Sequence, residues 1–140
     1  MPRASLTRRV IFSAAHRYRR PEWDNAKNEE VFGLCARESY HGHTYVCDVT
    51  VTGPIEPKTG FVVSLGVLDG ILDTHVRRPL DHRNLNTDVA EFAEGRAIPT
   101  SENLAQWIAD RVQAVLPLPA KVSRVRVCEE PALWATWERD

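Results

Sequence analysis

The stretch HTYVCDVTVTG, residues 43–53, has the clearest strand pattern in the chain. Its β-branched residues alternate with other types, and Gly53-Pro54 is a stop signal. Side chains two apart on a strand point to the same side. One face of this strand, continued back to residue 41, is therefore predicted to carry His41, His43, Tyr45, Cys47, Val49 and Val51. A partner strand is predicted over residues 6–16, with one face formed by Val10, Phe12, Ala14 and His16.

Two helices and two more strands are predicted further along the chain. The first helix covers roughly 65–78, with Ser64 as its N-cap and Pro79 as its stop. The second begins at a Thr100 or Ser101 cap and ends at Pro117. The closing strands are predicted at 121–130 and 133–139. The connections are 17–34, with a short helix after Asp24, the loop 80–86 and the irregular segment 87–99.

The order of two strands, two helices and two strands predicts an α+β fold. We expect a single domain over residues 1–140, in which a four-stranded antiparallel sheet carries both helices on one face. Such a sheet leaves its other face and its edges uncovered. Burial against copies of the same chain is one solution to that exposure, so a homo-oligomer is expected.

Composition narrows the class of protein. The chain has 140 residues, of which 43% are hydrophobic and 26% charged, as in globular domains. A net charge of −1 argues against a nucleic-acid partner. No apolar run approaches the roughly 20 residues of a membrane span, and no signal peptide is recognisable. An odd count of three cysteines favours reduced thiols and a cytoplasmic location.

Three histidines form the candidate metal site. His41 and His43 are two residues apart on one strand and can converge on one point. His16 ends the strand expected to pair antiparallel with theirs, so it meets them at the same end. Three neutral imidazoles with a fourth position open are typical of catalytic Zn²⁺. His75 lies on the apolar stripe of the first helix and is predicted to be a core or interface residue.

Five segments in this order resemble the 6-pyruvoyl-tetrahydropterin synthase family over nearly the whole chain. They are FSAAH (12–16), FGLCARESYHGHTY (32–45), LDHRNLN (80–86), PTSEN (99–103) and VCEE (127–130). The resemblance implies a tunnelling fold (T-fold), in which the sheets of several subunits join into a barrel. It also implies hexamers, with active sites between subunits.

The family's functional residues correspond to nine positions of this sequence. The zinc ligands are matched by His16, His41 and His43. The catalytic cysteine is matched by Cys35, and the catalytic Asp-His pair by Asp81 and His82. The substrate-binding residues are matched by Glu129, Thr100 and Ser101.

These roles also have a physical interpretation. Cys35 lies in a loop, where a thiol with a pKa lowered by Zn²⁺ can act as a base or a nucleophile. Asp81 can fix the tautomer of His82 in a proton relay. Glu129 alternates with two valines and is expected to face inward, where it can bind the two-donor edge of a pterin. One or more of the arginines at 17, 19 and 20 is expected to contact a triphosphate.

The implied reaction converts 7,8-dihydroneopterin triphosphate into 6-pyruvoyl-tetrahydropterin with release of triphosphate. The alternative is the 6-carboxy-tetrahydropterin synthase of queuosine biosynthesis, which uses the same substrate and metal. Five residues separate Cys35 from His41, as in the pyruvoyl-forming enzymes, whereas the queuosine enzymes have three. Two further alternatives are a pterin- or metal-binding paralogue without turnover and a nucleic-acid binder that uses the N-terminal arginines. The last would show salt-sensitive association.

Overall fold

The computed structural model describes residues 2–140. Its sheet has the strand order β3-β1-β2-β4-β5, and every pairing is antiparallel except that of β3 with β1. The strands are β1 (Arg3–His16), β2 (His41–Pro54), β3 (Arg83–Asn84), β4 (Lys121–Glu130) and β5 (Leu133–Glu138). The α+β fold and the four long antiparallel strands are confirmed. The two-residue β3 was missed, because the loop around it has no strand pattern of its own.

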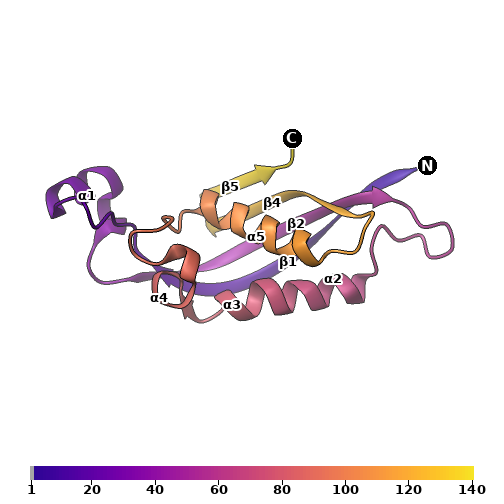
Figure 1. Cartoon of the computed structure of the whole chain (residues 1–140), viewed down its shortest axis with the longest axis horizontal. Helices are drawn as coiled ribbons and strands as arrows, with labels where there is room; N and C mark the ends of the chain where they lie inside the picture. Colours follow the sequence, from indigo (N-terminus) through magenta and orange to yellow (C-terminus); the bar gives the residue numbers. More distant parts are fainter. Residues whose placement is uncertain (1) are drawn as a thin grey trace.

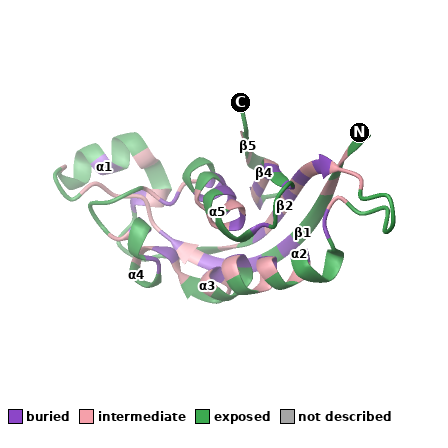
Figure 2. Cartoon of the chain, turned by 45° about the vertical axis from the view of Figure 1, so that its right-hand side comes forward, coloured by how far each residue is buried: buried purple, intermediate pink, exposed green. Residues whose placement is uncertain are grey.

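The longer helices lie on one face of the sheet, as predicted (Figure 1). The α-helices are α1 (Asn25–Phe32), α2 (Leu65–Leu72), α3 (Arg78–Leu80), α4 (Leu85–Asp88) and α5 (Ser101–Val115). Short 3₁₀ turns cover Gly33–Ala36 and Ala90–Phe92, and a π-helical turn covers Asp73–Arg77. Helix α1 projects from one end of the sheet and is mostly exposed (Figures 1 and 2). None of the helices in residues 2–140 has the length and apolar character required to cross a membrane.

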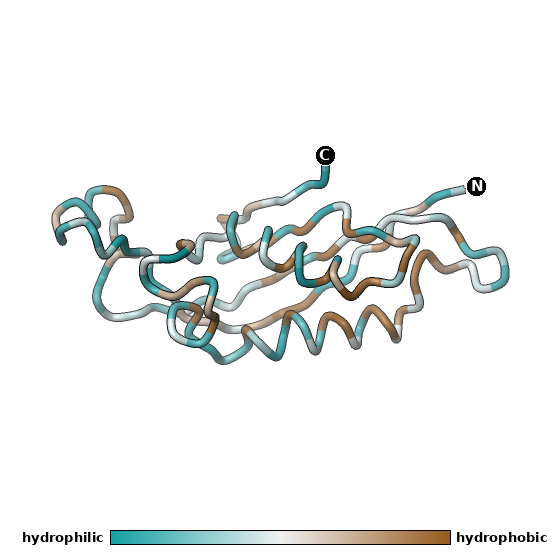
Figure 3. The backbone as a smooth tube through the Cα atoms, in the orientation of Figure 1, coloured by the Kyte–Doolittle hydropathy of each residue, from teal (hydrophilic) through white to brown (hydrophobic). Residues whose placement is uncertain are grey.

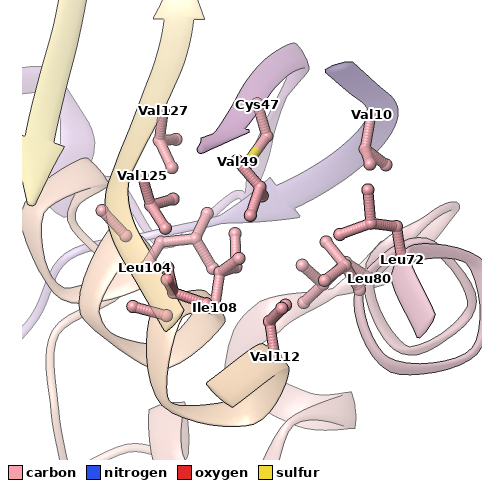
Figure 4. Close-up of a cluster of buried hydrophobic side chains, with 14 of the residues drawn as sticks. Val10, Cys47, Val49, Leu72, Leu80, Leu104, Ile108, Val112, Val125 and Val127 are labelled. Atoms are coloured by element: carbon pink, nitrogen blue, oxygen red, sulfur yellow. The ribbon is translucent and has the colours of Figure 1, made fainter. Parts of the chain in front are cut away.

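The core fills the space between the sheet and the helices α2, α3 and α5. Apolar segments of these helices and of the central strands are visible in Figure 3, and Figure 4 shows Ile108 and Leu104 of α5 packed toward Val125 and Val49. Those four side chains are fully buried. Burying one such side chain contributes about 1.5–3 kcal/mol, so the two strand faces predicted from the sequence account for much of the stability.

The first predicted helix continues past Pro79 and ends at Leu80 as α3, two residues beyond its expected end. Pro79 has no N–H, which leaves the carbonyl of His75, four residues earlier, without its usual partner. Arg111 of α5 supplies one, because its Nε donates to that carbonyl at 2.9 Å. The π-helical turn, whose hydrogen bonds span five residues, comes directly before this segment. The prediction that Pro79 stops the helix was therefore wrong.

The other predicted boundaries are close to the observed ones. Ser64 occupies the N-cap position of α2, although its side chain makes no capping bond. Thr100, rather than Ser101, caps α5 by accepting a hydrogen bond from the N–H of Asn103 at 3.1 Å. The short helix after Asp24 is present as α1, and Asp24 caps it by accepting from the N–H of Lys27 at 2.8 Å.

The hydrogen bond from Arg111 to the carbonyl of His75 is expected to contribute to stability. Replacing Arg111 with Leu keeps an apolar stem but removes the donor to the carbonyl of His75. We expect the free energy of unfolding, measured by urea denaturation, to fall by about 1–3 kcal/mol. Arg78→Leu is the matched control, because it removes only an exposed ion pair with Asp73 and should lose less than about 1 kcal/mol. Equal losses in the two variants would contradict this role of Arg111.

Candidate active site

The register of β1 and β2 brings the three histidines together. His16 lies directly opposite His41, and Ala14 lies opposite His43. The Nε2 atoms of His16 and His41 are 3.1 Å apart. One ligand atom from each of the three rings lies within 4.8 Å of the others, so the cluster could hold a metal ion. The predicted convergence of these rings is therefore found in the structure.

The chemistry of the cluster fits a divalent cation. Burial lowers the pKa of His41 and of His43, and neighbouring imidazoles lower both further. Neutral rings are the form that binds metals. Nε2 of His43 is buried and forms no hydrogen bond of good geometry among the described residues, and its nearest polar neighbour is Oε1 of Glu129 at 3.1 Å. Three imidazole donors that leave further positions open form a coordination set typical of catalytic zinc.

Glu129 lies beside the histidines, at the end of β4. Its side chain is nearly buried, and its Oε1 lies 3.2 Å from Nε2 of His16 and 3.1 Å from Nε2 of His43. The hydroxyl of Tyr18 donates to the same oxygen at 3.4 Å. The hydrogen bond with His16 holds the pKa of Glu129 below its usual value, against the effect of burial. The inward-facing carboxylate predicted from the sequence is present, and it stays ionised.

Cys35 is in the 3₁₀ turn that follows α1. Its carbonyl accepts a hydrogen bond from the N–H of Tyr18 at 2.7 Å, which ties the turn to the segment after His16. Burial raises the pKa of the Cys35 thiol, and the charge of Glu129 raises it further. The expectation of a lowered pKa depended on a nearby cation. Without a cation, burial and the charge of Glu129 raise the pKa of this thiol instead of lowering it.

Asp81 and His82 form a pair on the rim of the sheet. Oδ2 of Asp81 lies 3.1 Å from Nδ1 of His82, and Oδ1 accepts from the N–H of Ser13 at 2.9 Å. His82 has a φ of 58° and donates its own N–H to the carbonyl of Ser13 at 2.6 Å. The His82 side chain is 83% exposed. The pair exists as predicted, but this chain does not bring its imidazole into the histidine cluster.

Thr100 and Ser101 differ in what their hydroxyls can do. Thr100 uses its oxygen to cap α5. The side chain of Ser101 is buried, and its Oγ has no hydrogen-bond partner among the described residues. A buried hydroxyl without a partner is uncommon. Ser101 therefore has the greater capacity to bind a ligand group.

The three arginines after His16 bind backbone carbonyls of neighbouring loops. Arg17 donates to the carbonyl of Glu38 at 2.9 Å, Arg19 to that of Ala36 at 3.3 Å and Arg20 to that of Arg96 at 3.1 Å. These bonds hold the loops around the cluster together. The expected contact with a triphosphate remains a prediction.

Two tyrosines lie at the cluster: Tyr45 was predicted on the face of His41 and His43 but without a role, and Tyr18 was not predicted. Tyr18 contacts Glu129, and the hydroxyl of Tyr45 lies 2.8 Å from Nδ1 of His16. A signal was available for both residues. Tyr18 follows His16 by two positions, and Tyr45 follows His43 by two positions on the same strand face.

A family model, curated sequences and solved structures all match this chain, and they agree with one another. The sequence model of the family described as "6-pyruvoyl tetrahydropterin synthase" matches residues 5–140. A curated relative, the 6-pyruvoyl tetrahydrobiopterin synthase of Drosophila melanogaster, is 42% identical over 130 residues, which cover 93% of this chain and 76% of the relative. The dihydroneopterin monophosphate aldolase of Pyrococcus furiosus is 34% identical over 127 residues, covering 91% and 90%. The solved 6-pyruvoyl tetrahydropterin synthase of Caenorhabditis elegans superposes with a TM-score of 0.92 at 33% identity, covering 100% of this chain and 98% of that one.

The Asp81 contacts predict a pH dependence of stability. The hydrogen bond from the N–H of Ser13 lowers the pKa of Asp81 below its ordinary value of 3.8. A carboxyl group with a lowered folded-state pKa stabilises the fold above the unfolded-state pKa, and this contribution is lost as the pH falls through the folded-state value. Asp81→Asn should therefore be least stable relative to the parent chain at neutral pH, and the difference should narrow below about pH 4.

The measurement is urea denaturation of both chains between neutral pH and about pH 3. Asp110→Asn is the control, because within residues 2–140 Asp110 accepts a single side-chain hydrogen bond, from Gln106 on the exposed face of α5. It should change stability little at any pH. A gap between Asp81→Asn and the parent chain that stays constant across the range would contradict the prediction.

Proposed function

Because the chain belongs to the 6-pyruvoyl tetrahydropterin synthase family, we propose that it is a zinc-dependent lyase. Its substrate is 7,8-dihydroneopterin triphosphate, and its products are 6-pyruvoyl-tetrahydropterin and triphosphate. The observation that carries the proposal is the cluster of three imidazole donors within 4.8 Å, with the ionised Glu129 beside it. A metal site next to a buried carboxylate suits a substrate with both oxygen ligands and N–H donors.

His16, His41 and His43 would hold the zinc ion. The Nε2 atoms of the three histidines lie close together beside Glu129. The His16 side chain is fully buried. When bound, zinc acts as a Lewis acid on oxygens of the substrate side chain and makes the adjacent C–H bond acidic. The remaining chemistry is proton transfer and substrate binding by side chains of the protein.

Each remaining site residue has one role in this scheme. The Cys35 thiolate removes the proton from the side-chain carbon, and His82, oriented by Asp81, moves a proton at the neighbouring oxygen. Glu129 accepts two hydrogen bonds from the amino group and the ring N–H of the pterin. Ser101 and Thr100 bind the same ring near the start of α5, and Arg17, Arg19 or Arg20 contacts the triphosphate.

The active form is proposed to be a hexamer in the cytoplasm, with each site shared between two chains. Two observations support a shared site. His82 is exposed on the rim of its own chain and is not one of the three histidines that converge in the cluster. The edge strand β5 and the uncovered face of the sheet expose large apolar residues, including Leu133, Trp134 and Ile11. Joining sheet edges into a barrel would cover such an edge.

Other reactions on the same scaffold remain competitors. Formation of 6-carboxy-tetrahydropterin uses the same substrate and metal and also releases acetaldehyde. The Pyrococcus furiosus relative is named as an aldolase that acts on dihydroneopterin monophosphate, so carbon–carbon cleavage is a third candidate reaction. A paralogue that binds a pterin without turnover would form no product.

The first test is product identification. We expect zinc-loaded protein incubated with 7,8-dihydroneopterin triphosphate to form 6-pyruvoyl-tetrahydropterin and triphosphate, identified by mass spectrometry. Cys35→Ala should lower the rate by about 10²–10⁴-fold, the usual contribution of a positioned base. Cys128→Ala is the matched control, because Cys128 lies within β4.

Other outcomes would replace the proposal. A 6-carboxy product with acetaldehyde would assign the chain to the queuosine branch. Turnover of dihydroneopterin monophosphate instead would assign it to the aldolases. No turnover with tight pterin binding would make it a binding protein.

A second test addresses the shared site. Cys35→Ala and His82→Ala chains are each expected to be nearly inactive alone. If a site takes Cys35 from one chain and His82 from another, equal mixing with subunit exchange restores about a quarter of the sites, as random assembly of a symmetric oligomer dictates. Activity is measured before and after unfolding and refolding of the mixture. Mixed chains that stay inactive, while refolded parent chain recovers, would show that both residues serve their own chain.

A further inference from the structure

Tyr45 is the buried neighbour of the metal cluster on β2. Its side chain is fully buried and stacks on Phe12, with ring centroids 5.1 Å apart and an interplanar angle of 18°. Its hydroxyl lies 2.8 Å from Nδ1 of His16, which is also fully buried. Within residues 2–140, neither of these two atoms has another hydrogen-bond partner. The core thus holds the tyrosine ring rigidly and presents its oxygen to one atom of one histidine.

The opposite end of the His16 ring faces the cluster. Its Nε2 lies 3.1 Å from Nε2 of His41 and 3.2 Å from Oε1 of Glu129. A neutral imidazole carries one proton, on either Nδ1 or Nε2. Binding a metal through Nε2 requires that proton to be on Nδ1, where it must be donated to an acceptor. The oxygen of Tyr45 is the acceptor in position.

A hydroxyl suits this place because it can donate as well as accept. Without a metal, Nε2–H of His16 can donate to Glu129, and Nδ1 then accepts from the Tyr45 hydroxyl. With a metal on Nε2, Nδ1–H donates to the same oxygen. A carboxylate at this position would serve only the second state, and an ammonium group only the first. Tyr45 can therefore keep Nδ1 of His16 paired in both states while its ring stays in place and its hydroxyl hydrogen rotates.

We propose that Tyr45 is a positioning residue of the metal site, whose hydroxyl sets the tautomer and ring plane of His16 and thereby strengthens metal binding. The inference rests on the proposed metal site at His16, His41 and His43. Hydrogen-bonded partners of metal-binding histidines typically contribute about 10- to 100-fold to metal affinity. The Tyr45 side chain is fully buried and its hydroxyl contacts His16, so its effect on the chemistry is exerted through His16.

The test compares zinc dissociation constants of metal-stripped chains, measured by competition with a chromophoric chelator. Tyr45→Phe keeps the ring and its stacking on Phe12 but removes the hydroxyl. We expect its zinc affinity to fall about 10- to 100-fold. Tyr40→Phe is the matched control: it removes a hydroxyl from the residue just before the ligand His41. Its affinity should stay within about twofold, since that hydroxyl makes no hydrogen bond within residues 2–140.

A second readout follows the proton directly. In zinc-loaded parent protein, long-range ¹H–¹⁵N spectra should show a proton on Nδ1 of His16 that exchanges slowly with water. In Tyr45→Phe the same proton should exchange faster. A purely structural role of Tyr45 would change thermal stability without moving this signal. The measurement on the parent chain alone also keeps the inference testable if the variant does not fold.

The outcomes separate this inference from the proposed function. A parent chain that binds no zinc would overturn the metal site, and the role of Tyr45 with it. A parent chain that binds zinc, with Tyr45→Phe binding equally tightly, would overturn only the role of Tyr45. An equal loss in Tyr40→Phe, or an unprotonated Nδ1 in the loaded parent chain, would do the same. Weaker binding confined to Tyr45→Phe, with faster exchange of the Nδ1 proton, would establish it.

Discussion

In the pairing of β1 with β2, Val10 lies opposite Cys47 and His16 opposite His41. One register therefore places both the apolar core and the three histidines of the cluster on the same side of the sheet. A slip of one residue would turn the whole face of β1 to the opposite side, so the core would lose its packing together with the cluster. The packing of Phe12 and Val49 in the core therefore fixes the strand register that brings the three histidines together.

The cluster places ionisable groups where an apolar core would otherwise continue. His16 is fully buried and Glu129 is nearly so, and burial of such groups is unfavourable unless they are paired. Their mutual contact, together with Tyr18 and Tyr45, supplies the pairing. Nε2 of His43 is paired less well: it lies 3.1 Å from Oε1 of Glu129, but no hydrogen bond of good geometry forms there within residues 2–140. A ligand that binds the three converging imidazoles would complete the pairing of this atom.

Sequence patterns predicted what depends on neighbours along one strand or helix. The faces of β1 and β2 followed from alternation, and the convergence of His16 with His41 followed from the expected pairing of the two strands. What was missed depends on contacts between distant segments. The helix passes Pro79 because Arg111 binds the carbonyl of His75, and β3 forms because Ser13 binds the loop at His82. No local pattern carries these contacts.

The position of His82 follows from the edge on which it lies. Its N–H and the carboxylate of Asp81 both bind the backbone of Ser13, so the pair is fixed at the β3 edge of the sheet. Glu129 is the residue before the last of β4, the strand that pairs with the opposite edge strand, β5. Because β1 and β4 both run antiparallel to β2, His16 and Glu129 lie at the same end of the sheet. If sheets join edge to edge in a ring, the β3 edge of one chain meets the β5 edge of the next, and His82 then approaches a neighbour's Glu129 rather than its own cluster. The exposure of His82 in a single chain agrees with the shared site proposed above.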